Sequence, residues 1–98
     1  MSPAYIVGEV TVHNPEGYAQ YAQKVPGTIA QHGGQYLVRG GNSTQLEGQA
    51  HGSRRVVIMF PSRAAAEAWY HGPEYQAILP LRQANSEGHL ALVDGLAA

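Results

Sequence analysis

The sequence predicts an α+β fold in which strands and helices follow one another in the order βαββαβ. Three observations support this prediction. Residues 4–13 and 54–60 are rich in β-branched and aromatic side chains in strand-like patterns. Residues 15–32 and 63–71 carry apolar side chains at spacings of three and four, as helices that pack on a sheet do. Glycine and proline residues separate these segments and mark the turns.

The first strand is expected to have two unlike faces. Ile6, Val10 and Val12 fall on one side of its period-two pattern. The other side reads Tyr5, Val7, Glu9, Thr11 and His13. This second side is too aromatic and apolar for simple exposure to solvent, so we expect something to cover it.

The first helix is expected to begin directly after this strand. Asn14 is a favourable cap, and Pro15 suits the first helical position, where a missing N–H costs nothing. Pro26 removes a backbone donor and clashes with the preceding turn, so we expect a kink or short break near Val25. The two glycines at 33–34 are expected to end the helix.

The middle of the chain is expected to form a hairpin with a long loop. The second strand, QYLVRGG, has Arg39 at its far end. Residues 40–53 are rich in Gly, Ser, Asn and Gln, and within them the segment TQLEG is expected to add a short edge strand. The third strand, 54–60, is apolar on both faces, which indicates burial on both.

The last third of the chain is expected to hold a second helical region and a final strand. Ser62 caps a helix that Gly72 ends, and Pro73 begins a further helical piece. The inward residues of the first of these helices are expected to be Ala65, Ala68 and Trp69. The segment HLALVDG is the last strand.

This order of elements predicts a ferredoxin-like arrangement. Crossovers between strands are right-handed, so the simplest solution is a four-stranded antiparallel sheet with its helices on one face. The other face then carries apolar and aromatic residues without a helix over them, and such a patch usually marks an interface. We therefore expect a homodimer in which two such faces cover each other.

Length and composition narrow the class of protein. Ninety-eight residues predict a single domain over 1–98. A net charge of −1 without a basic stripe argues against a nucleic-acid partner, and no cysteine is present to form a disulfide or a thiolate site. No segment reads as a signal peptide or a membrane span, so we expect a cytoplasmic protein without a membrane partner.

Two segments taken together, GGQYLVRGG and AWYHGPEYQ, carry a family resemblance. With NPEGYAQYAQKVPGTIAQH, LRQANSEG and LVDG, they make the chain similar to the small bacterial proteins of the DUF1330 family over nearly its whole length. The resemblance implies a dimeric α+β barrel, in which two ferredoxin-like sheets pack face to face. His71 and Gly72 depart from the family pattern, which more often has a small polar residue before the proline.

Three residues are the predicted catalytic candidates. His13 ends the first strand on the suspected interface, where it is either a general base or a turn histidine. Arg39 either orients a carboxylate ligand or forms an ion pair with Glu9 or Glu47. Tyr21 is a candidate hydrogen-bond donor, although buried tyrosine hydroxyls commonly bond to the backbone. Arg39 and His13 are expected to converge on one cleft.

Four residues are the predicted substrate-binding candidates: Tyr5, Trp69, Tyr75 and Arg82. For Trp69 a core position is favoured, because it shares a helical stripe with small alanines. For Arg82 a solvated position is favoured, because long charged side chains usually extend outward. The five histidines show no metal-ligand spacing, so we expect no metal, and we expect no cofactor.

The residues and the fold together suggest a small-molecule protein. We expect a dimer that binds a small organic acid, lactone or aromatic metabolite in a pocket between the two sheets, with cofactor-independent proton transfer, isomerisation or cyclisation as its chemistry. One alternative is a dimer without catalytic activity that binds a metabolite or a protein. A weaker alternative is a haem-dependent monooxygenase, although no histidine is convincingly placed as its axial ligand.

Overall fold

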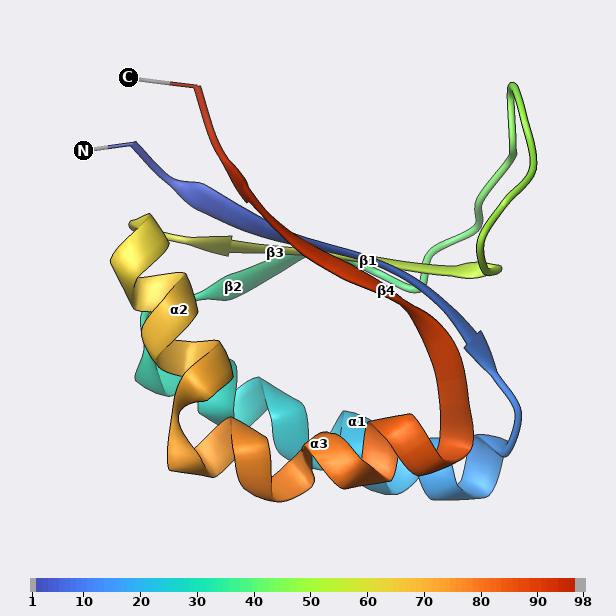
Figure 1. Cartoon of the computed structure of the whole chain (residues 1–98), viewed down its shortest axis with the longest axis horizontal. Helices are drawn as coiled ribbons and strands as arrows, with labels where there is room; N and C mark the ends of the chain where they lie inside the picture. Colours follow the sequence, from blue (N-terminus) through green and yellow to red (C-terminus); the bar gives the residue numbers. More distant parts are fainter. Residues whose placement is uncertain (1, 97–98) are drawn as a thin grey trace.

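The computed structural model describes residues 2–96 and contains one sheet with helices on one of its faces (Figure 1). The elements are β1 (Ala4–Val12), α1 (Pro15–Gln31), β2 (Gln35–Arg39), β3 (Arg54–Phe60), α2 (Arg63–His71), α3 (Pro73–Asn85) and β4 (Ser86–Asp94). The strands pair antiparallel in the order β2-β3-β1-β4. The predicted α+β class and ferredoxin-like sheet are therefore confirmed.

The core lies between the sheet and the helices. Every second residue of β1, including Ile6 and Val10, is buried there, as the period-two pattern predicts. Trp69 is 1% exposed, and its ring lies 4.2 Å from that of Tyr75. Its indole nitrogen donates to the Thr28 hydroxyl at 2.9 Å, so the one polar atom of the ring is also satisfied. The prediction that Trp69 belongs to the core is confirmed.

Three local predictions were wrong. Helix α1 runs without a break through Pro26, because its other hydrogen bonds and its packing carry the helix past the missing donor. The fully buried alanine of α2 is Ala66, three residues before Trp69. Of the two alanines that were predicted to face inward, Ala65 is half-buried against the core and Ala68 is exposed. The segment 44–48 forms no strand, since the loop that contains it rises away from the sheet (Figure 1).

The sheet face opposite the helices is open in this chain (Figure 1). Its apolar residues come from all four strands: Tyr5, Val7, Val38, Val57, Met59, Ala91 and Val93. Val7 is 39% exposed and Val93 is 48% exposed. An apolar face of this kind is unusual on a monomer unless another surface covers it.

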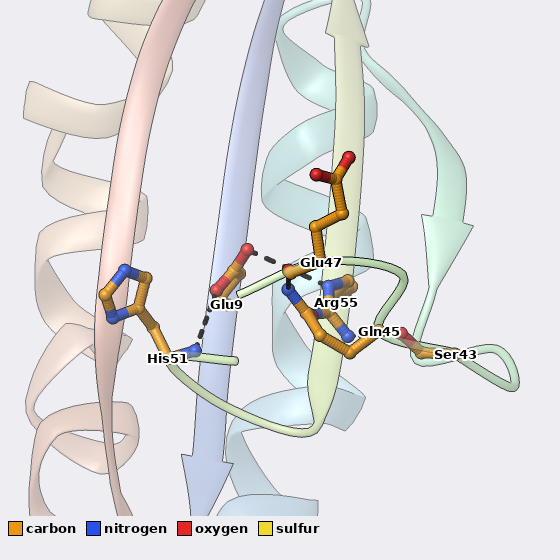
Figure 2. A network of polar contacts seen from close by, with 6 residues as sticks. All are labelled: Glu9, Ser43, Gln45, Glu47, His51 and Arg55. Carbon is orange, nitrogen blue, oxygen red and sulfur yellow. Dashed lines mark hydrogen bonds and ion pairs between the residues drawn. The ribbon is translucent and has the colours of Figure 1, made fainter. Parts of the chain in front are cut away.

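The long loop 40–53 is fixed to this open face by a polar network (Figure 2). Glu9 accepts a hydrogen bond from the backbone N–H of His51 at 3.1 Å and forms an ion pair with Arg55 at 3.8 Å. Arg55 in turn donates to the side chains of Ser43 and Gln45. The loop therefore has a defined base.

No helix in the described range 2–96 is long and apolar enough to cross a membrane.

Candidate functional site

A small cavity lies between the helix-bearing face of the sheet and helices α1, α2 and α3. Its volume is about 30 Å³, which is room for about one water molecule. Its wall consists of Ile6, Gly8, Val10, Tyr18, Tyr21, Ala22, Val25, Tyr36, Arg39, Arg54, Val56, Ile58, Trp69, Arg82 and Leu90. Three arginines, three tyrosines and a tryptophan thus surround one space within a single chain.

The three arginines of this wall have no acidic partner among residues 2–96. Arg39 donates to the backbone carbonyl of Ala22 at 2.7 Å. Arg82 donates through Nε to the Tyr75 hydroxyl at 3.2 Å. The guanidinium of Arg54 lies 5.3 Å from the centre of the Tyr18 ring, and its buried Nε has no acceptor. Three positive charges are therefore directed toward one cavity without neutralisation by a carboxylate.

Arg54 reaches the cavity because of strand parity and one glycine. It stands two residues before Val56, so the pleat of β3 turns both side chains toward the helices. Gly40 has a φ of +68°, and a β-carbon at this position would overlap the Arg54 guanidinium. A glycine therefore satisfies both the backbone conformation and the space that the arginine needs.

Arg39 is held at the cavity wall by an acceptor that Pro26 frees. In an α-helix the carbonyl of Ala22 would accept from the N–H of the residue four positions later. That residue is Pro26, which has no N–H, so the carbonyl accepts from Arg39 instead. The Arg39 guanidinium also lies 4.8 Å from the centre of the Tyr36 ring. Arg39 itself is exposed, so it forms the part of the cavity wall that borders solvent.

Two tyrosines form a buried pair beside the arginines. The hydroxyls of Tyr21 and Tyr75 are 2.9 Å apart, and Tyr75 also accepts from Arg82. Burial, reinforced by the neighbouring Tyr75, raises the pKa of Tyr21 far above its ordinary value. Tyr21 therefore stays a neutral phenol near neutral pH, with a hydroxyl proton to donate, and its role as a donor to a ligand stays a prediction.

The structure does not bring His13 to this cavity. His13 follows β1 at the edge of the sheet, and its Nε2 lies 3.3 Å from Glu87. Arg39 is level with Gly8 across β3, five positions before His13 along β1. The predicted convergence of Arg39 and His13 is therefore wrong, because the two strands end at different heights of the sheet. Tyr5 is also remote, since it faces the open side.

The candidate cavity lies elsewhere than the predicted pocket between the sheets of two subunits, which one chain does not test and which stays a prediction. Tyr21, Trp69, Tyr75 and Arg82 meet under the helices of one chain, whereas a pocket between two sheets was expected. Arg82 is 9% exposed, because it lies seven residues after Tyr75 on the same side of α3. The solvated interpretation of Arg82 was wrong.

The predicted ion pair of Arg39 with Glu9 or Glu47 is wrong as well. Glu9 pairs with Arg55 on the opposite face of the sheet. Sequence reasoning also missed Arg54. The signal was present in the segment RRVVIMF, since the strand alternation that places Val56 and Ile58 inside also places Arg54 inside.

A larger groove adjoins the cavity. It has a volume of about 280 Å³ and is lined by Ile6, Glu67, Tyr70, His71, Leu90, Ala91 and Leu92. Ile6 and Leu90 belong to the walls of both the cavity and the groove. These two aliphatic side chains thus lie between the cavity and a larger groove with aliphatic and polar side chains in its wall.

The described residues do not form a haem or metal site. Within residues 2–96 no three His, Asp or Glu side chains gather as metal ligands would. The cavity wall contains no histidine, and the raised pKa of Tyr21 disfavours the phenolate through which a tyrosine would bind iron. The donor set of this wall therefore does not fit haem.

A ferredoxin-like sheet with a basic, tyrosine-lined cavity beneath its helices defines the class of protein. The chain belongs to the family described as "Domain of unknown function (DUF1330)", whose profile matches residues 3–96. The family resemblance drawn from the sequence is thus confirmed. Comparison with the curated proteins found no match.

Several solved structures share this fold. A protein of unknown function from Rhodopseudomonas palustris, RPA0582, is 22% identical, with a TM-score of 0.79 over 99% of this chain and 85% of that one. SnoaB from Streptomyces nogalater, described as a cofactor-independent oxygenase, is 14% identical, with a TM-score of 0.66 over 100% and 97%. A dimeric ferredoxin-like protein of unknown function from Jannaschia is 15% identical, with a TM-score of 0.63 over 97% and 99%. Identities this low show a common fold.

Proposed function

We propose that this protein binds a small organic anion in the cavity between the sheet and the helices. The observation that carries the proposal is that Arg39, Arg54 and Arg82 come from three different elements and face one space without an acidic partner among the described residues. Arg82 is buried and Arg54 is half-buried, and guanidinium groups withdrawn from water are costly unless an anion or several acceptors accompany them. A carboxylate fits their planar geometry.

The groove sets the size and chemistry of the rest of the ligand. The cavity alone has room for about a water molecule, so a larger ligand needs the Leu90 and Ile6 partition or Arg39 to move. The adjoining groove of about 280 Å³ offers apolar walls. An organic acid or aromatic metabolite, or a lactone with its polar end inward, would place its charged part on the arginines and its apolar part in the groove.

The chemistry that the wall supports is stabilisation of a negative oxygen. Tyr21 donates a hydrogen bond and the arginines supply positive charge, which together would stabilise an enolate or phenolate form of a bound substrate. The described cavity wall contains no carboxylate or imidazole to take a proton, whereas Glu67 and His71 line the adjoining groove. A cofactor-independent isomerisation or cyclisation here would therefore rely on one of these two groups, on a base within the substrate or on solvent. The likeness in fold to SnoaB, described as a cofactor-independent oxygenase, supports chemistry of this kind. Binding without catalysis is the alternative.

The working unit in this proposal is a homodimer. A second copy would cover the open face that carries Tyr5, Val7 and Val57. The dimeric ferredoxin-like protein from Jannaschia, which shares the fold, supports this assembly. The cavity lies on the opposite side of the sheet, so each subunit would carry its own site.

Titration of isotope-labelled protein with benzoate, followed by NMR, tests the binding proposal. The amide signals of Arg39, Arg54 and Tyr21 are expected to shift. Arg54→Gln is expected to weaken binding about 10- to 150-fold, the equivalent of about 1.5 to 3 kcal/mol for hydrogen bonds to a charged group. Arg63→Gln is the control for loss of one positive charge, because Arg63 is exposed and lines neither the cavity nor the groove.

Two results would overturn the proposal. One is the absence of saturable shifts at the cavity with benzoate and with 3-phenylpropionate, which has a longer apolar part. The other is an equal loss of affinity in Arg54→Gln and Arg63→Gln, since that would indicate nonspecific attraction to positive charge.

A further inference from the structure

The Tyr21 and Tyr75 pair has one more proton than it has internal acceptors. The two hydroxyls share one hydrogen bond, which uses one of their two protons. The other neighbour of the pair, Arg82 Nε, is a donor only and cannot accept the second proton. Among the described residues no other group accepts from either hydroxyl. One phenolic proton is therefore left over in a place where Tyr21 is 7% exposed and Tyr75 is fully buried.

The chemistry of the cavity wall suggests which tyrosine carries this proton. Tyr75 receives a hydrogen bond from Arg82 and does not line the cavity, whereas Tyr21 does. If Tyr75 donates to Tyr21, the remaining proton belongs to Tyr21 and can point into the cavity. The chain of donors then runs from Arg82 through Tyr75 to Tyr21, and each bond polarises the next.

A second unmatched donor faces the same cavity. Arg54 Nε is buried and has no acceptor. Its guanidinium lies 5.3 Å from the centre of the Tyr18 ring, and the Tyr18 and Tyr21 rings are 5.5 Å apart. The Tyr18 ring is thus a neighbour of both the Arg54 guanidinium and the Tyr21 ring. A buried donor without an acceptor is unfavourable, so both donors favour a ligand that supplies acceptors.

We propose that the site recognises an organic acid with a second, separate acceptor oxygen, such as an aromatic keto acid. The carboxylate would bind Arg54, and the carbonyl or enolate oxygen would accept from Tyr21. Tyr75 would be a positioning residue, because it orients the Tyr21 proton and does not line the cavity. Arg82 would orient Tyr75 through its Nε and also line the cavity. This inference rests on the proposed function and adds the ligand class and the role of the tyrosine pair.

Two probes of nearly the same shape test it. 4-Acetylbenzoate carries a carbonyl oxygen opposite its carboxylate, and 4-isopropylbenzoate has a methyl group at that place. Calorimetric titration of the full chain is expected to show that 4-acetylbenzoate binds about 2- to 12-fold more tightly, the value of one added hydrogen bond. Tyr21→Phe is expected to abolish this preference and to leave the affinity for 4-isopropylbenzoate nearly unchanged. Tyr75→Phe is expected to reduce the preference without abolishing it, and Tyr5→Phe, on the open face, is expected to preserve it.

A measurement on the unaltered protein guards against variants that do not fold. The carbonyl carbon of 4-acetylbenzoate, labelled with carbon-13, is expected to move downfield on binding, because a hydrogen bond withdraws electron density from it. An unshifted carbonyl, or a preference that survives in Tyr21→Phe, would refute this inference while anion binding stands. If neither probe binds, the proposed function fails first.

Discussion

Replacing Trp69 with alanine is expected to destabilise the protein more than any other single truncation of its core. Trp69 is 1% exposed and contacts Phe60 and Tyr75, with ring centres 5.4 and 4.2 Å away. It also ties α2 to α1, because its indole nitrogen donates to Thr28 across 41 positions of sequence. The substitution therefore removes a large apolar ring and a link between two helices at once.

The expected magnitude follows from this burial. Truncation of a fully buried Trp to Ala typically costs about 3 to 5 kcal/mol, the sum of lost transfer free energy and the cavity left behind. The free energy of unfolding of a domain of this length is about 5 to 15 kcal/mol in total. The melting temperature should fall by at least about 12 °C, since each kcal/mol shifts it by about 4 to 8 °C in a chain of this size.

Chemical denaturation followed by far-UV circular dichroism measures this loss. Tryptophan fluorescence is unsuitable because Trp69 is the only tryptophan. All variants are compared at one chain concentration, since association adds to apparent stability. Leu46→Ala is the control, because Leu46 is 90% exposed in the loop, and it is expected to change stability by less than about 0.5 kcal/mol. A loss below about 1.5 kcal/mol for Trp69→Ala would refute the assignment of Trp69 to the core.

Three further outcomes are expected. Sedimentation equilibrium should give twice the 10.5 kDa mass of one chain. The variant Val57→Asp, which puts a charge on the open face, should give a monomer. An unchanged mass for this variant would argue for another interface. Gly34→Ala should destabilise the protein because a β-carbon would meet Phe60 at 2.6 Å, whereas Gly41→Ala meets nothing within 4 Å; equal melting temperatures for both would contradict the packing at Gly34. The free energy of unfolding should fall above pH 10 by up to about 1.4 kcal/mol per pH unit through Tyr21. The reason is that folding raises the pKa of Tyr21, so the unfolded chain loses this proton first. Tyr21→Phe should show a shallower decline, and an identical slope would exclude this coupling.

Much of the fold could be predicted from local patterns. The alternation of Ile6 and Val10, the cap at Ser62 and the Gly72 to Pro73 junction each have a local cause, and each is found in the structure. Local rules were insufficient where a residue's surroundings decide its state. The segment 44–48 has strand-like residues, but no neighbouring strand lies beside it to pair with.

The candidate site was harder to predict for a physical reason. Tyr21, Tyr75 and Arg82 were named from the sequence, but their meeting depends on how α3 packs against α1, which periodicity does not specify. His13 was misplaced because the face on which a strand residue lies and its distance along the strand are separate quantities. In the alternation of β1, His13 falls on the same face as Glu9. It lies farther along the sheet, however, than the level at which β2 ends with Arg39.

Pro26 sets a trade-off between the rigidity of α1 and the position of Arg39. The proline withholds one helical hydrogen bond, and the released Ala22 carbonyl becomes the only described acceptor that fixes Arg39 at the cavity wall. In a chain of this family with a strong helix former at the equivalent place, the backbone N–H of that residue would donate to the carbonyl again. The helical hydrogen bond would be restored, and the arginine would lose this acceptor. Its helix would be firmer and its arginine would be released to solvent. A proline that local rules mark as unfavourable in a helix thus determines the position of a side chain on β2. Substitution of this proline would change access to the cavity without replacing any residue that lines it.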